Sequence, residues 1–298
     1  MKNSNKNRRD VLKALAGTAG LSLAAGIDAR LSASENVLPA SLKGRVNHSV
    51  CRWCYRDIEF EDLCKASVEI GLKSIEIISV KDFPVLKKYG LSCAMASTSF
   101  PGFGITNGWN KIENHKAMIE GFKVDIDHVA NAGFKNLITF SGNREPGLSD
   151  EQGLENCAIG IKQIMEYAEK RGVVIVMELL NSKVNHPNYM CDHTSWGVEL
   201  CKKIGSENFK LLYDIYHMQI MDGDVIQTIK DNHQYFAHYH TGGVPGRNEI
   251  DDTQELYYPA IIKAILDTGY TGYLGQEFIP KREDKLASLK QGVTICDV

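Results

Sequence analysis

The chain has 298 residues, of which 43% are hydrophobic and 24% are charged, and its formal net charge at pH 7 is −3. This composition is typical of a folded globular protein and excludes an intrinsically disordered chain. The small negative charge provides no basic field for a phosphate backbone, so we expect a small-molecule substrate and no nucleic-acid partner.

The beginning of the chain has the pattern of an export signal. Arg8 and Arg9 are followed by a mildly apolar stretch over residues 14–27 and then by small residues. This order is typical of a signal peptide, and the paired arginines resemble the twin-arginine signal, which the bacterial export machinery reads. The apolar stretch is too short and too rich in Gly and Ala for a stable membrane span. We therefore expect a signal peptide over residues 1–34, a single catalytic domain without a membrane span over residues 35–298, and a periplasmic location.

From residue 46 onward, short β-type runs alternate with amphipathic helical patterns, and no low-complexity linker divides the chain. Apolar residues recur at helical spacing in "FEDLCKASVEIG" (60–71) and in "CAIGIKQIMEYAEKRG" (157–172). Several helices are expected to close on a glycine in the left-handed conformation, at positions 71, 90, 133, 172 and 269. Eight strands are predicted, at residues 46–50, 73–79, 91–97, 136–141, 173–179, 209–214, 235–240 and 272–278.

Eight βα units in a mature chain of about 260 residues match the number and length of a TIM (β/α)8 barrel, an α/β fold. The competing architecture, a doubly wound open sheet, usually carries a glycine-rich dinucleotide loop after its first strand. The corresponding segment here, "HSVCRWCYRD" (48–57), has no such loop. The eight cysteines are scattered, and the "CRWC" pair at 51–54 has no partner pair that would complete a zinc site. We therefore expect mostly free, buried thiols.

Four consecutive predicted strands end in a residue that can bind a metal ion. The fifth strand presents Glu178, the sixth Asp214, the seventh His238 and His240, and the eighth Glu277. Active sites of TIM barrels lie where the strands end, so these side chains are expected to converge. The two histidines share one face of their strand, and His240 is the expected ligand because it is nearer the strand end.

The chemistry of these residues indicates the kind of ion. Two Glu, one Asp and one His suit a divalent cation of intermediate hardness, Mn²⁺, Mg²⁺ or Co²⁺, with Zn²⁺ as a further option. Each acid alone could instead cap the next helix or pair with a neighbouring cation. Three carboxylates buried side by side without a cation would be costly, which favours a metal site for the four residues together.

Two nearby residues are candidates for binding the substrate. His217, three residues after Asp214, could reach a substrate oxygen from its loop, and Arg247 could clamp a carboxylate or hydroxyl. The alternatives are a solvated loop histidine and a surface arginine. The aromatic residues Trp53, Tyr55 and Trp109 are expected either to wall the pocket or to pack on the surface, and His48 is a candidate for the barrel interior.

Four segments carry a resemblance to a known family: "MELLNS" (177–182), "YDIYHMQ" (213–219), "HTGGVPGRNEI" (240–250) and "GYLGQEF" (272–278). From about residue 46 to its end, the chain resembles hydroxypyruvate isomerase and its relatives in the xylose isomerase-like TIM-barrel superfamily, which also holds ketose 3-epimerases. The resemblance implies a metal-dependent sugar or keto-acid isomerase that works through an enediolate and converts hydroxypyruvate to tartronate semialdehyde. It also implies site residues: Glu178, Asp214, His240 and Glu277 as metal ligands, Glu178 and Glu277 also as the proton-transfer carboxylates, and His217 and Arg247 as substrate-binding residues.

Several alternatives stay open. Hydroxypyruvate isomerases carry Gln where this chain has His240, whereas ketose epimerases carry His, so a ketose 3-epimerase is one alternative. A periplasmic enzyme would also meet sugars released from glycans, and a lyase or hydrolase acting on keto-sugars is another. A DNA-repair endonuclease would need a His-rich, multi-zinc rim and a basic face, and the acidic balance disfavours it. A complete ligand set disfavours a sugar-binding protein without activity. The oligomeric state, a homo-oligomer included, also stays open.

Overall fold

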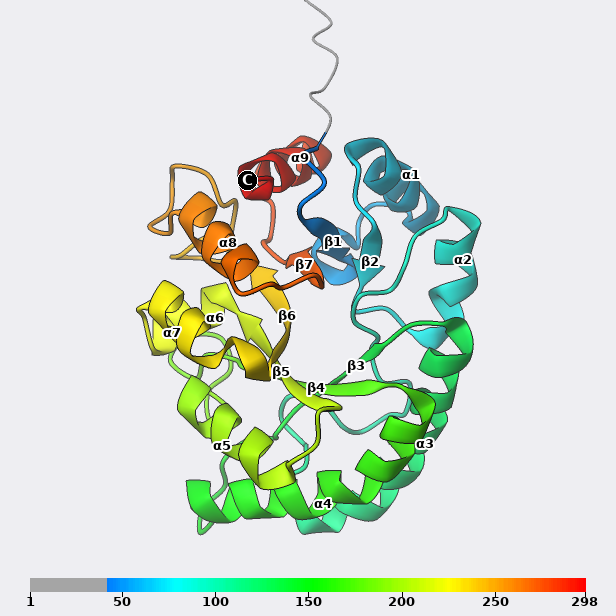
Figure 1. The fold of residues 1–298 in the computed structure, drawn as a ribbon, viewed down its shortest axis with the longest axis vertical. Coiled ribbons are helices and arrows are strands. Elements are labelled where there is room, and N and C mark those ends of the chain that lie inside the picture. The colour runs from blue at the N-terminus through cyan, green and yellow to red at the C-terminus, as the bar shows by residue number, and fades with distance from the viewer. Residues whose placement is uncertain (1–41) are drawn as a thin grey trace, which may run out of the picture. The chain divides into compact units, whose positions relative to one another are not determined.

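The computed structural model describes residues 42–298, so the predicted signal peptide lies outside the described residues. The described residues form one compact unit. In this unit the strands lie at the centre and the helices surround them (Figure 1). The fold is the predicted α/β TIM barrel.

Seven parallel strands form the sheet, in the order β2-β1-β7-β6-β5-β4-β3. They are β1 (Asn47–Cys51), β2 (Ser74–Glu76), β3 (Asn136–Thr139), β4 (Val174–Glu178), β5 (Phe209–Asp214), β6 (Phe236–Thr241) and β7 (Tyr273–Gln276). Each overlaps a predicted strand. The four neighbouring strands β4 to β7 are those that were expected to carry the candidate ligands.

The predicted strand at 91–97 is wrong as a continuous strand, although the segment occupies the expected place in the barrel. Ala96 forms isolated parallel bridges with Ile78, beyond the end of β2, and with Leu137 of β3. Regular pairing is interrupted on the β2 side because Ile77 has a φ of 54°, a left-handed conformation that a strand cannot contain. The segment therefore closes the barrel between β2 and β3 through single bridges.

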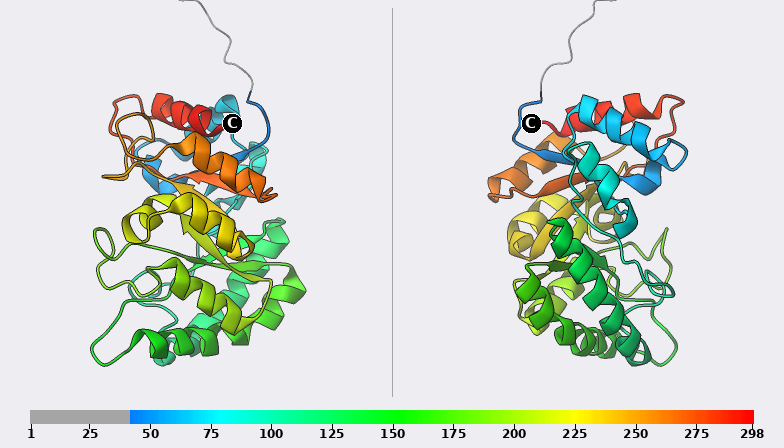
Figure 2. Two further views of the ribbon diagram at one scale, coloured as in Figure 1. Left: turned by 60° about the vertical axis from the view of Figure 1, so that its left-hand side comes forward. Right: turned by 90° about the vertical axis from the view of Figure 1, so that its right-hand side faces the viewer.

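The helices α1 (Phe60–Ile70) and α9 (Lys285–Cys296) lie side by side and complete the outer ring (Figure 1). The two turned views in Figure 2 show the helices along the outside of the strands. The other helices are α2 (Phe83–Lys88), α3 (His115–Ala132), α4 (Asp150–Arg171), α5 (Thr194–Ile204), α6 (Ile215–Met221), α7 (Val225–Asn232) and α8 (Tyr258–Asp267). The expected left-handed conformation is confirmed by positive φ angles at Gly71, Gly90, Gly133, Gly172 and Gly269. Among residues 42–298, no helix has both the length and the apolar composition of a membrane span.

The core has two parts, as the two faces of a barrel strand require. The larger part lies between the strands and the helices, and a smaller cluster fills the barrel with Met95, Ile138, Val174, Val176 and Leu212. Side chains alternate along each strand, so Glu178, two positions after Val176, faces inward. Asp214, two positions after Leu212, faces inward for the same reason. This alternation places Glu178 and Asp214 on top of an apolar plug.

Two lesser expectations concern the first strand and the cysteines. The expectation that His48 faces the barrel interior is wrong, because its Nε2 lies 4.0 Å from Asp297 Oδ1, just after α9. An inward position on β1 is held by Cys51, three residues after His48, and its Sγ lies 3.6 Å from His240 Nε2. All eight cysteines lie in the described part of the chain, and they are free and buried, as expected.

Candidate metal centre and active site

The four candidate ligands converge at the carboxyl ends of neighbouring strands. Glu178 ends β4, Asp214 ends β5, His240 lies near the end of β6, and Glu277 directly follows β7. One ligand atom from each lies within 4.8 Å of the ligand atoms of the others, and all four side chains are buried. The structure therefore brings together the four side chains that the strand-end argument expected to converge.

The orientation of His240 fits a metal ion. Its Nε2 lies 2.6 Å from Glu76 Oε1, and its Nδ1 lies 2.8 Å from Glu277 Oε2 and 3.6 Å from Glu178 Oε1. The contacts of Nδ1 lack hydrogen-bond geometry, and Glu178 Oε1 also has no hydrogen-bond partner among the described residues. Although burial opposes it, the contacts with Cys51 and Glu277 hold the pKa of His240 well above its ordinary value. With Nε2–H donated to Glu76, Nδ1 is the ring nitrogen that faces the carboxylates, and a cation among the four groups would displace the proton from it.

The electrostatics of the group lead to the same conclusion. Burial raises the pKa of Asp214 to about 8, and burial together with the neighbouring charge of Glu277 raises the pKa of Glu178. Although burial opposes it, the charges of Arg247 and His240 hold the pKa of Glu277 well below its ordinary value. The local cations therefore balance only part of the negative charge, and the three carboxylates and one imidazole are a donor set that fits a divalent ion.

Arg247 is buried, so the alternative of a surface arginine is wrong. Its Nη2 donates to Asp214 Oδ2 at 3.0 Å and to Glu277 Oε2 at 2.5 Å. Its guanidinium carbon lies 5.1 Å from the centroid of the Trp53 ring and 5.4 Å from that of Tyr216. The guanidinium is therefore held between two aromatic rings and orients two of the four candidate ligands.

His217 is fully buried in the first turn of α6, so the expectation of a loop position, solvated or not, is wrong. Asp214 caps this helix, because its Oδ1 accepts from the backbone N–H of His217 at 3.2 Å. The Nδ1 of His217 accepts from the backbone N–H of Asn181 at 3.0 Å, which leaves the proton on Nε2. That Nε2 lies 3.6 Å from Asp214 Oδ2 and has no hydrogen-bond partner among the described residues. Burial and the charge of Arg247 place the pKa of His217 well below its ordinary value, so the ring is a neutral donor.

A cavity of about 260 Å³ opens onto the ligand group. Since a water molecule takes up about 30 Å³, this volume suits a small sugar or acid. The polar residues and the tryptophan of its lining are Trp53, Arg56, Glu178, His186, Arg247 and Glu277. The remaining wall is apolar and consists of Ile77, Ile105, Ile138, Phe140 and Leu180.

The three aromatic residues singled out from the sequence have different positions. Trp53 lies in a short 3-10 helix (Arg52–Tyr55) after β1, lines the cavity, and donates from Nε1 to Glu277 Oε1 at 2.7 Å. Tyr55 and Trp109 are fully buried in the core. Both expected alternatives, a place in the pocket wall and packing on the surface, are therefore wrong for these two residues. The indole N–H of Trp109 donates to Thr139 Oγ1 at 2.7 Å.

We expect the Trp53→Phe substitution to lower kcat/KM by about 10- to 100-fold, because hydrogen bonds to charged groups contribute about 1.5–3 kcal/mol. The ring is kept, so the contact with Arg247 remains and only the N–H to Glu277 is lost. Trp109→Phe is a matched control that removes an indole hydrogen bond away from the cavity, and steady-state kinetics should show little change. Equal kinetics for both variants would contradict the importance of the Trp53 contact.

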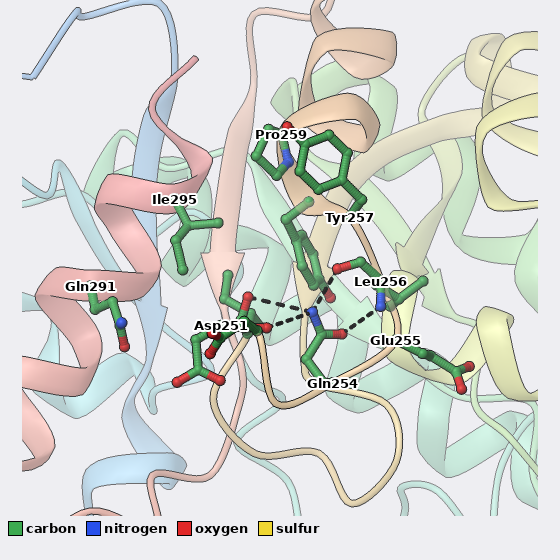
Figure 3. A pocket seen from close by; sticks show the side chains of 11 residues that line it. Asp251, Gln254, Glu255, Leu256, Tyr257, Pro259, Gln291 and Ile295 are labelled. Carbon is green, nitrogen blue, oxygen red and sulfur yellow. Dashed lines mark hydrogen bonds between the residues drawn. The ribbon is translucent and has the colours of Figure 1, made fainter. Parts of the chain in front are cut away.

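A larger cavity, of about 520 Å³, lies elsewhere, between the segment 250–259 and α9 (Figure 3). Gln254 organises its loop: the side-chain amide donates to Leu256 O at 2.6 Å and to Asp251 O at 3.1 Å. The residues that line this cavity include none of the four candidate ligands, and neither His217 nor Arg247. The candidate active site is therefore the smaller cavity over the ligand group.

In addition to Arg56 and His186 of the cavity wall, sequence reasoning missed Glu76. It ends β2 and its Oε1 accepts from His238 Nε2 at 2.7 Å as well as from His240 Nε2. A strand-end acid was the signal that could have revealed it. The predicted strand over 73–79 hid this signal, because Glu76 fell in its middle, whereas β2 ends at Glu76.

A TIM barrel with an acidic ligand group at its carboxyl face is an enzyme architecture. The chain belongs to the xylose isomerase-like TIM barrel family, whose model matches residues 65–294. A 2-oxo-tetronate isomerase of Pectobacterium atrosepticum is 27% identical over 244 residues, which are 78% of this chain and 92% of that protein. A human protein with the provisional name hydroxypyruvate isomerase is 32% identical over 109 residues, 37% of this chain and 39% of that protein.

Among solved structures, a Brucella melitensis protein described as a family 2 AP endonuclease superposes with a TM-score of 0.71. It is 22% identical and the match covers 82% of this chain and 97% of that chain, so the likeness shows the fold alone. The relatives that match in sequence confirm the expected class of enzyme, an isomerase.

Proposed function

We propose that this protein is a metal-dependent isomerase of short sugars or keto acids that works through an enediolate. The observation that carries the proposal is the convergence of Glu178, Asp214, His240 and Glu277 in one buried group beneath a small cavity. The relatives named for 2-oxo-tetronate and hydroxypyruvate support substrates in which a carbonyl lies next to a carbon that bears a hydroxyl. Conversion of hydroxypyruvate to tartronate semialdehyde is one such reaction.

The four ligands would hold Mn²⁺, Mg²⁺ or Co²⁺, or else Zn²⁺. When bound, such an ion polarises the substrate carbonyl and so acidifies the neighbouring C–H. Glu178 and Glu277 both line the cavity, and each can act as a base there. One of them removes the proton from the hydroxyl-bearing carbon, and the same or the other carboxyl returns it to the former carbonyl carbon. The hydroxyl proton passes to the former carbonyl oxygen, so that the hydroxyl and the carbonyl exchange places.

Two further residues would hold the substrate. His217 presents its free Nε2–H, and since the ring is neutral it can donate to a substrate oxygen without first losing a hydrogen bond. Arg247 lines the cavity, and only its Nη2 is engaged by the carboxylates, so further guanidinium donors are available for a substrate carboxylate or hydroxyl.

The test is a substrate panel. The metal-free protein, resupplied with Mn²⁺ or Mg²⁺ in D₂O, is given hydroxypyruvate, 2-oxo-tetronate, free ketoses and keto-glycosides, and products are followed by NMR. The proposal expects deuterium in a product whose carbonyl has moved by one carbon. Inversion at one carbon would instead indicate a ketose 3-epimerase, the second candidate, which the resemblance at His240 favours. Loss of a substituent would indicate a lyase or hydrolase.

We also propose that the protein is exported to the periplasm by the twin-arginine route, on the sequence pattern around Arg8 and Arg9. Replacing both arginines by lysine is expected to retain the protein in the cytoplasm, whereas the unaltered chain should appear in the periplasmic fraction. Immunoblots of cell fractions measure this, and equal distribution of the two chains would contradict the export proposal.

A further inference from the structure

Beneath the ligand group lies a buried carboxylate that the proposed reaction does not use. Glu76 is fully buried, and its Oε1 lies 2.6 Å from His240 Nε2 and 2.7 Å from His238 Nε2. Cys51 Sγ lies 3.6 Å from the same oxygen. Glu76 Oε1 therefore contacts two imidazoles and a thiol. It meets His240 at Nε2, whereas Nδ1 of the same ring faces Glu277 and Glu178.

These distances distinguish hydrogen bonding from a second metal site. Cys51, Glu76 and His240 also form a group compact enough to hold an ion. However, two ligand atoms with bonds of about 2.0–2.1 Å to one tetrahedral ion lie about 3.3 Å apart. The separations of 2.6 and 2.7 Å between oxygen and nitrogen are those of charge-assisted hydrogen bonds. Both imidazoles therefore donate Nε2–H to Glu76.

The backbone nearby is shaped to admit this carboxylate. A Cβ at Gly275 of β7 would lie 2.4 Å from Glu76 Oε1 and 2.7 Å from His240 Cδ2. Only glycine leaves room for the two side chains to meet at this point of the strand. The second donor, His238, holds the same oxygen from the neighbouring inward position on β6.

We propose that Glu76 is a positioning residue of the metal centre: by accepting Nε2–H of His240, it fixes the tautomer and the ring orientation that present Nδ1 to the ion. The inference rests on the metal site of the proposed function. Carboxylates that orient a metal-binding histidine in this way typically change metal affinity by about 10- to 100-fold when they are removed. Glu76 thereby sets the affinity of the site without touching the substrate.

The experiment compares four metal-free proteins: wild type, Glu76→Gln, Gly275→Ala and the control Glu249→Gln. Glu249 is another buried glutamate, whose Oε1 accepts from the backbone N–H groups of Lys281 and Arg282 and from the Ser288 hydroxyl. Mn²⁺ is titrated by calorimetry, and thermal unfolding is recorded for each protein. Imidazole ¹⁵N NMR of the metal-free proteins follows the Nε2–H proton of His240.

The proposal expects about 10- to 100-fold weaker Mn²⁺ binding for Glu76→Gln and an affinity close to wild type for Glu249→Gln. A folded Glu76→Gln protein that binds Mn²⁺ as tightly as wild type would overturn it. If Glu76→Gln shows no cooperative unfolding, Gly275→Ala decides, because it displaces Glu76 and His240 without changing an acid or a histidine. Weakened binding then supports the proposal and unchanged binding overturns it.

The NMR measurement separates this proposal from the proposed function. A protected Nε2–H signal of His240 is expected in wild type, and in Glu76→Gln, whose neutral amide oxygen is a weaker acceptor, this proton should exchange faster with solvent. Its absence from wild type would overturn the role of Glu76 even if Mn²⁺ binds. Conversely, a wild type that shows this signal but binds no metal would contradict the metal site of the proposed function. A second Mn²⁺ per chain would also overturn the hydrogen-bonded arrangement.

Discussion

Replacing Glu178 with glutamine is expected to lower the rate of proton transfer by about 10²- to 10⁴-fold, the usual contribution of a general base. Glutamine has the shape of glutamate but cannot accept the proton. The change should leave the barrel intact, because Glu178 Oε1 has no hydrogen-bond partner among residues 42–298 and the side chain sits at the open end of the apolar plug. Deuterium incorporation from D₂O, measured at saturating metal, reports the rate.

The control for this prediction is Glu249→Gln, which alters a buried carboxylate that does not line the cavity. It should lower the midpoint of thermal unfolding and leave the exchange rate close to that of wild type. If Glu178→Gln retains the wild-type exchange rate, Glu178 does not transfer the proton, and Glu277 would have to serve alone. If the two variants lose activity equally, the effect on Glu178→Gln reflects folding rather than catalysis.

The second large effect is expected for Asp214→Asn, which should weaken binding of the divalent ion by at least about 100-fold. Asparagine caps a helix as well as aspartate does, so the start of α6 is preserved. The charge is lost, however, and leaving Arg247 without one of its two buried partners costs about 3–5 kcal/mol. The substitution therefore tests the charge of Asp214 separately from its structural contact with His217.

Calorimetric titration and thermal unfolding with and without metal measure this effect. Wild type should gain about 2.7 kcal/mol at a metal concentration of 100 times Kd, and Asp214→Asn should gain much less at the same concentration. Asp125→Asn is the matched control, since Asp125 is a fully buried aspartate of α3 that accepts from the backbone N–H of Ser99 at 2.7 Å. Full metal stabilisation of Asp214→Asn would show that Asp214 is not a ligand.

The fold and the ligand group could be predicted because both follow from simple periodicities. Apolar strand runs end in an acid or a histidine at regular intervals, and the alternation of side chains determines which of these point inward, as with Glu178 two positions beyond Val176. Alternation puts His238 and His240 on the same face, and the position nearer the strand end favoured His240. Each of these arguments needs only the local sequence and the architecture of a parallel barrel.

What escaped prediction depends on contacts between distant segments. The N–H of Trp53 reaches Glu277 across 224 positions, and Glu76 meets His240 across 164 positions. No local pattern specifies such pairs. The burial of Arg247 is a further case, because a loop arginine looks solvated until the two acids and the two rings that enclose it are brought together. The single bridges of segment 91–97 likewise depend on the backbone of Ile77, outside that segment.

The most direct test of the proposed chemistry is a titration of the metal-free protein with Mn²⁺ in D₂O, with the rate of deuterium incorporation into the substrate measured at each step. If Glu178, Asp214, His240 and Glu277 hold one catalytic ion, the rate rises from near zero and saturates at one equivalent of Mn²⁺ per chain. Exchange at full rate in the metal-free protein, or no exchange at any Mn²⁺ concentration with every substrate of the panel, would contradict a metal-dependent enediolate isomerase.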